Sequence, residues 1–133
     1  MLSYKNILVP VDFEKGSESA IIKAANHSEA SDSLLMVAHV IDSQTLNQGE
    51  PAETAGMAEA RLDALLDSLE IGYCEKLVVE GDTVDSLLRL IQQHNIDLVV
   101  MGTAVKEEPS RLVKSITVAV VTNTECDVLV LHK

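Results

Sequence analysis

Asp97-Leu-Val-Val-Met-Gly102 is the stretch of this sequence that decides the fold. Its continuous apolar run predicts a strand covered on both faces, and the glycine ends that strand. A charged segment then leads through Lys114-Ser115-Ile116 into a helix expected over residues 110–122. In an α/β domain, a glycine turn before a helix N-terminus is a place where anions bind. Whether this loop can hold a phosphate is therefore the main functional question.

Similar apolar runs recur on both sides of this stretch and predict four further strands, at Lys5–Asp12, Leu34–Ile41, Cys74–Val79 and Val128–Leu131. Segments with helical periodicity lie between the strands and predict helices. The first has Ser17 as its N-cap, the second begins at Ala55, and the third has Asp82 or Thr83 as its N-cap. The second of these helices is expected to end at Leu69 and the third near His94-Asn95. Alternating strands and helices over 133 residues predict one α/β domain with a parallel sheet, although this pattern does not fix the strand order. Ligands are expected at the carboxyl ends of the strands, and three of those ends carry acids, Asp12, Asp42 and Asp82.

The charge of the chain excludes several classes of partner. With 10 basic and 21 acidic residues, the net charge is −11, which repels DNA, RNA and anionic membrane surfaces. Aromatic residues make up only 2% of the chain, so no stacking platform for bases is expected. The sequence shows neither a signal peptide nor an apolar run of membrane-spanning length, and we expect a cytoplasmic protein.

Five segments in order resemble the universal stress protein family. They are Lys5-Asn-Ile-Leu-Val-Pro-Val-Asp12, Val40 at the end of the second strand, Gly81-Asp82, Asp97-Leu-Val-Val-Met-Gly102 and Cys126-Asp-Val-Leu-Val-Leu131. The resemblance covers nearly the whole chain. It implies a Rossmann-like, five-stranded open parallel sheet in the order 3-2-1-4-5, with helices on both faces. It also implies a role in the stress response.

The family contains members that bind ATP and members that do not. The resemblance implies that binding uses G-x-x-G, a spacer of about nine residues and then G-[S/T] as a phosphate loop. In this chain Gly102 matches the first glycine and Ser115 the closing hydroxyl, but Val105 and Lys114 replace the other two glycines. The spacer between Val105 and Lys114 is also one residue short. Because a β-branched valine resists positive φ, we expect weak or no ATP binding.

The alternative is an adenine nucleotide site, for ATP or AMP with Mg²⁺, at the carboxyl ends of the first and fourth strands. The resemblance places it at Val11, Asp12, Val40, Met101, Gly102 and Ser115. Each residue also has a structural interpretation. Asp12 can simply end a strand and order the next turn, Val40 and Met101 would be apolar in any buried strand, and a helix serine commonly satisfies its own backbone.

Neither a metal site nor a catalytic centre is predicted, because the four histidines are scattered and no nucleophile lies at a useful spacing from a base. A slow ATPase or an autophosphorylating enzyme, for which Ser115 would be the first residue to test, is a third alternative. Cys74 begins the third predicted strand and Cys126 lies just before the fifth, and the implied strand order places these two strands at opposite edges of the sheet. The two thiols are therefore expected to be too far apart for an intrachain disulfide. The apolar fifth strand Val128, Leu129, Val130, Leu131 is expected at an exposed edge. Pairing about a two-fold axis would cover it, so we expect a homodimer, as the resemblance also implies.

Overall fold

The computed structural model describes residues 4–13, 16–42, 54–102 and 111–131. Strands and helices alternate along the chain, as predicted. They are β1 (Asn6–Pro10), α1 (Ser17–Ser31), β2 (Leu34–Asp42), α2 (Ala55–Ser68), β3 (Glu75–Gly81), α3 (Thr83–Gln93), β4 (Leu98–Gly102), α4 (Arg111–Asn123) and β5 (Asp127–Leu131). The predicted strands differ from these at their ends; the first is shorter than Lys5–Asp12, and the third continues past Val79 to Gly81.

The five strands form one parallel sheet in the order β3-β2-β1-β4-β5, which confirms the predicted order. β1 is the central strand, and Leu8 lies beside Met36 of β2 on one side and Val99 of β4 on the other. The chain moves outward from β1 to β3 and then crosses back to β4. All carboxyl ends of the strands therefore face the same edge of the sheet, where α/β domains bind ligands.

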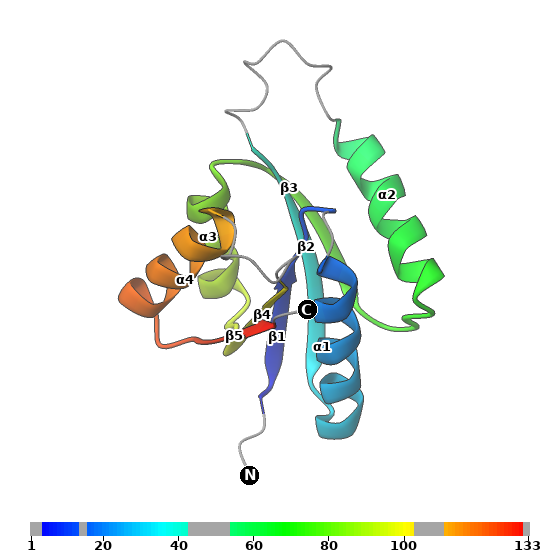
Figure 1. The fold of residues 1–133 in the computed structure, drawn as a ribbon, viewed down its shortest axis with the longest axis horizontal. Helices are drawn as coiled ribbons and strands as arrows, with labels where there is room; N and C mark the ends of the chain where they lie inside the picture. The colour runs from blue at the N-terminus through cyan, green and yellow to red at the C-terminus, as the bar shows by residue number, and fades with distance from the viewer. Residues whose placement is uncertain (1–3, 14–15, 43–53, 103–110, 132–133) are drawn as a thin grey trace.

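Two helices cover each face of the sheet (Figure 1). The face under α1 and α2 holds one apolar cluster, which includes Ile21 and Leu62 from the helices and Val9 and Val37 from the strands. The opposite face holds a second cluster under α3 and α4, with Leu8 and Val99 among its strand residues. This double coverage explains why the central strands are apolar throughout rather than alternating.

The start of α1 differs from the prediction. Gly16, with φ 98°, is the N-cap, and Ser17 is the first helical residue rather than the cap. The left-handed backbone at this position favours glycine, and the Ser17 hydroxyl instead donates to Asp12 Oδ1 at 3.2 Å. At α3 the prediction is confirmed, since the Asp82 carboxylate caps the helix by accepting from the Asp85 amide at 2.9 Å.

Both cysteines are free thiols that precede the two edge strands, Cys74 before β3 and Cys126 before β5. Burial raises the pKa of Cys126 to about 11, and the nearby carboxylates of Asp97 and Asp127 act in the same direction. Burial also raises the pKa of Cys74. Both groups therefore carry their protons at neutral pH, which makes them weak nucleophiles. Among the described helices, none is long and apolar enough to cross a membrane.

Candidate functional site

A pocket of about 270 Å³ opens at the carboxyl ends of β1 and β2, where α3 begins. It contains three of the residues that the sequence placed in an adenine site, namely Val11, Asp12 and Val40. Its complete lining is Pro10, Val11, Asp12, Ala38, His39, Val40, Asp42, Thr83 and Leu87. Five of these residues are apolar, and we call the polar residues Asp12, Asp42 and Thr83 the rim of the pocket.

Val40 offers backbone groups to this pocket because β2 continues past the end of β1. Among the described residues, the backbone pairing of the two segments ends at the hydrogen bond from the Val11 amide to the Ala38 carbonyl, 2.8 Å long. Beyond it, β2 is paired with β3 alone, with Val40 beside Val79 and Asp42 beside Gly81. In a parallel ladder, alternate residues direct both N–H and C=O to the same side. Val40 therefore directs its amide and carbonyl toward the pocket, as Ala38 directs its carbonyl toward β1.

The acids predicted at the strand ends all make hydrogen bonds at the start of a helix. Asp12 accepts from the Ser17 hydroxyl in α1, and Asp82 caps α3. Asp42 Oδ2 accepts from the Thr83 hydroxyl at 2.9 Å, which joins the end of β2 to the first residue of α3. Each carboxylate thus has a structural role that requires no ligand, and each also places negative charge beside a helix N-terminus, where it is favourable.

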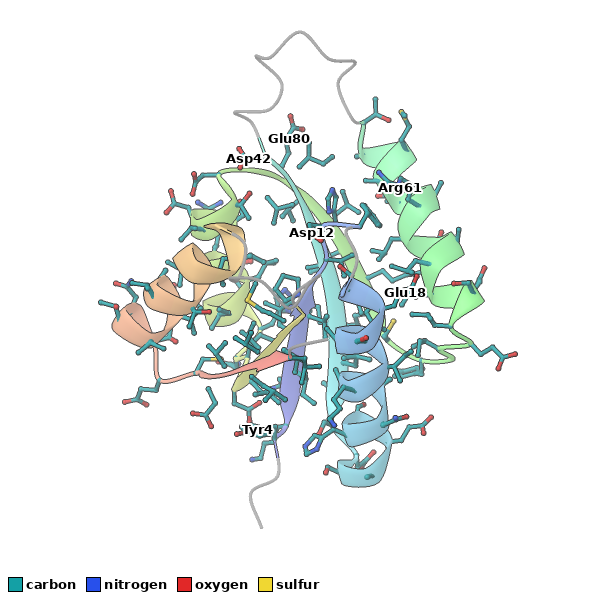
Figure 2. All side chains as sticks on the ribbon, in the orientation of Figure 1. Tyr4, Asp12, Glu18, Asp42, Arg61 and Glu80 are labelled. Carbon is teal, nitrogen blue, oxygen red and sulfur yellow. The ribbon has the colours of Figure 1, made fainter. Side chains whose placement is uncertain are left out.

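The charge around the pocket is negative. Figure 2 shows Asp12, Asp42 and Glu80 at the carboxyl edge of the sheet. Of the described residues that line the pocket, two are aspartates and none is a lysine or an arginine. Arg61 of α2 is also at this end of the molecule (Figure 2), but its guanidinium stacks 4.2 Å above the ring of Phe13. The described part of the rim therefore carries more negative than positive charge.

His39 belongs to the site although the sequence analysis did not identify it. The side chain is buried, and Nδ1–H donates to the Val11 carbonyl at 2.6 Å. The His39 ring also packs against Phe13, with 4.5 Å between ring centroids. Phe13 has φ 62°, a left-handed conformation that is rare for an aromatic residue. His39, Phe13 and Arg61 thus form a stacked group that fixes the turn after β1.

Gly102 has a packing role that is independent of any phosphate. A Cβ added there would lie 2.1 Å from the carbonyl oxygen of Gly16, the N-cap of α1. The end of β4 and the start of α1 can approach this closely only because position 102 carries no side chain. Next to it, Met101 is buried in the cluster under α3 and α4, as its structural interpretation predicted.

The remaining part of the predicted phosphate loop falls largely outside the described residues. This applies to Val105 and the spacer that follows it. Lys114 and Ser115 belong to α4, but the positions of their side chains also lie outside the described part. The structure therefore brings together Val11, Asp12 and Val40 in one pocket and leaves the role of Ser115 a prediction. Within the described ranges, no group of three His, Cys, Asp or Glu side chains could hold a metal ion.

The chain was then compared with known proteins. The model of the universal stress protein family matches residues 3–132. The chain belongs to the universal stress protein family. A Staphylococcus haemolyticus protein assigned to the universal stress proteins is 31% identical over 145 aligned residues, which cover 99% of this chain and 87% of that protein.

Solved universal stress protein structures share the fold. One, in complex with cAMP, has a TM-score of 0.67 and 24% identity and covers 98% of each chain. Another, from Archaeoglobus fulgidus in complex with dAMP, has a TM-score of 0.62 and 17% identity, with coverage of 97% of this chain and 98% of that one. At these identities the likeness establishes the Rossmann-like architecture of the universal stress protein described here.

Proposed function

We propose that this universal stress protein is a cytoplasmic, homodimeric regulatory or interaction protein of the stress response, without catalytic turnover and with weak or no ATP binding. The main support for weak ATP binding is the acidic rim of the pocket. Asp12 and Asp42 line it, and the described lining supplies no lysine or arginine to balance them. The degenerate phosphate loop, with Val105 and Lys114 at glycine positions, acts in the same direction.

The size of the repulsion can be estimated. A phosphate charge about 6 Å from one carboxylate costs about 1 kcal/mol at an effective dielectric constant of about 60. ATP brings several such charges to a rim with two aspartates, whereas adenosine brings none. We therefore expect affinity to fall as phosphates are added, unless Mg²⁺ offsets the charge.

A second candidate function is the binding of an adenine nucleotide with one phosphate, in the class of AMP. The outward amide and carbonyl of Val40 form a donor and acceptor pair that matches the hydrogen-bonding edge of adenine, and more than half of the residues that line the pocket are apolar. Support also comes from the relatives whose structures contain cAMP or dAMP. On this alternative Val11, Asp12, Val40, Met101, Gly102 and Ser115 would surround the ligand.

Titration calorimetry with adenosine, AMP and ATP, each with and without Mg²⁺, separates the two candidates. The leading proposal expects ATP to bind more weakly than adenosine, and low-micromolar ATP affinity would overturn it. Asp42→Asn keeps an acceptor for the Thr83 hydroxyl while removing one rim charge, so it should strengthen ATP binding and leave adenosine binding unchanged. Glu125→Gln removes an exposed charge that is not in the pocket lining and serves as the matched control.

The homodimer is proposed from the edge strand β5. β5 pairs with β4 on one side, and Leu129 is 40% exposed. A groove of about 510 Å³ lies between α1 and this strand, with Leu98, Val100 and Leu129 among its apolar lining. His27 also lines it, and within the described part of the chain its Nε2 is buried without a hydrogen-bond partner. A second copy that pairs β5 with β5 would cover the groove and could satisfy this nitrogen.

Sedimentation of the purified chain tests the dimer. The expected species has twice the chain mass of 14.4 kDa, and a persistent monomer at tens of micromolar would contradict the proposal. Leu129→Lys should favour the monomer by placing a charge in the interface. Met57→Lys, at an exposed apolar position of α2 away from β5, should leave the mass unchanged.

A further inference from the structure

A second groove, of about 500 Å³, lies at the amino edge of the sheet, opposite the pocket at the carboxyl ends of β1 and β2. We call it the α1/α2 groove, because the C-terminal end of α1 and the segment after α2 form its walls. Both helices cover the same face of the sheet (Figure 1). Three apolar side chains in its lining are strongly exposed, with Ile22 at 42%, Leu34 at 57% and Tyr73 at 85%. Exposed apolar side chains that gather around one groove, with polar residues between them, are typical of an interaction site.

The described lining of the α1/α2 groove also carries negative charges that no basic residue in it balances. Glu29, Asp32 and Glu70 line it, and none of the described lining residues is basic. The C-termini of α1 and α2 both end at the groove, and each contributes the negative end of a helix dipole. Neither of these two described helices carries a basic residue in its last turn to offset that dipole. The groove therefore combines apolar surface with a strong preference for cations.

The backbone presents two of these acids from positions that usually hold glycine. Asp32 has φ 56° and Glu70 has φ 57°, each in the left-handed residue that ends its helix. After α2, the Glu70 amide donates to the Asp67 carbonyl and the Ile71 amide to the Leu66 carbonyl, both at 3.1 Å. This is the Schellman pattern, in which glycine is the usual residue and asparagine is the next most common. Glu70 thus places a carboxylate at the groove at a cost in backbone energy.

We propose that the α1/α2 groove binds a basic amphipathic segment of another protein. Apolar side chains of that segment would contact Ile22, Leu34 and Tyr73, and its lysines or arginines would pair with Glu29, Asp32 and Glu70. The lining of the groove also includes buried apolar residues such as Leu35. The inference gives a class of partner to the interaction role proposed above and rests on that role.

Charge complementarity distinguishes this occupant from the other candidates. A second copy of the chain also carries a net charge of −11, so it has little to offer three carboxylates. Nucleic acids and anionic membranes are repelled for the same reason. A small organic cation would satisfy the acids but would leave the exposed Ile22, Leu34 and Tyr73 without partners. A basic amphipathic polypeptide satisfies both properties.

The test uses a fluorescent synthetic peptide of leucine and lysine, patterned as an amphipathic helix, and the full-length protein. Two matched peptides replace either every lysine with glutamate or every leucine with serine. Fluorescence anisotropy should show binding of the leucine and lysine peptide only. Amide chemical shifts in NMR should change mainly around the end of α1 and residues 69–73.

Variants then locate the site. Glu29→Gln combined with Glu70→Gly should weaken binding roughly tenfold, and Tyr73→Ser should weaken it roughly threefold. The control Glu125→Gln, an exposed acid outside the groove lining, should change binding less than about twofold. Replacement of Glu70 by glycine suits the left-handed backbone, so weaker binding by that variant cannot be attributed to unfolding, which thermal denaturation will verify.

Several results would overturn the inference. These are no binding of the leucine and lysine peptide, equal weakening by all acidic variants including Glu125→Gln, and shift changes spread over the whole surface. Binding of the serine-containing lysine peptide, or of spermidine, with the same affinity would also overturn it, since the apolar residues would then have no role. The sedimentation and calorimetry experiments do not depend on peptide binding. If the peptide does not bind, the groove proposal is wrong, but the proposed function is still tested by those two experiments.

Discussion

Replacement of Gly102 by alanine is the sharpest test of what the glycine at the end of β4 does in this molecule. The added Cβ would lie 2.1 Å from the Gly16 carbonyl oxygen and 2.8 Å from its carbonyl carbon, far inside van der Waals contact. Both groups belong to backbone, so no side-chain rotation can relieve the overlap. Either the end of β4 or the start of α1 must move by about 1 Å or more, and we expect a loss of about 3 kcal/mol in the free energy of unfolding.

Urea denaturation followed by circular dichroism measures this loss. Gly56→Ala is the matched control, because Gly56 lies in α2 and a Cβ there meets nothing within 4 Å. Alanine at that position should stabilise the protein by about 0.5–1 kcal/mol. If Gly102→Ala changes stability no more than the control does, the packing explanation for Gly102 is wrong, and the interpretation as a phosphate-loop glycine gains support.

Two further predictions concern ionisation and backbone strain. The free energy of unfolding should fall by roughly 2 kcal/mol as pH rises from about 9 to about 11, because the unfolded chain releases the Cys126 proton before the folded chain does. Urea denaturation across this range should show a smaller fall in Cys126→Ala, and an equal fall in both proteins would refute the assignment. Glu70→Gly should raise the free energy of unfolding by about 1 kcal/mol, since glycine adopts φ 57° without strain. A lower thermal midpoint in that variant would contradict the prediction.

The strand order, the helix order and the acidic strand ends could be predicted because each depends on local chemistry or on the family resemblance. Asp82 is a clear example, since an aspartate before an amphipathic run caps a helix in most settings. The N-cap of α1 could not be predicted in this way. Ser17 has the better local propensity for a cap, but the close approach of Gly16 to Gly102 decides the geometry, and it joins residues far apart in the sequence.

The stacked group of His39, Phe13 and Arg61 was missed for a related reason. His39 belongs to β2, Phe13 follows β1, and Arg61 belongs to α2. Only the folded chain brings these three residues together. One signal was nevertheless present. His39 interrupts an otherwise apolar buried strand, and a buried polar side chain requires a hydrogen-bond partner, which here is the Val11 carbonyl. A histidine inside a buried apolar strand therefore indicates a specific hydrogen-bond partner even before the fold is known.

The stability of this fold and its expected weak affinity for ATP have a common cause. Asp12, Asp42 and Asp82 accept hydrogen bonds from residues in the first turns of α1 and α3, and so they hold the starts of these helices at the carboxyl edge of the sheet. The positive ends of those helices are thereby neutralised by the protein's own carboxylates, and an anionic ligand gains less from them. Removing an acid to improve phosphate binding should then cost a helix contact. Asp42→Asn, which changes the charge but keeps the acceptor, separates these two effects.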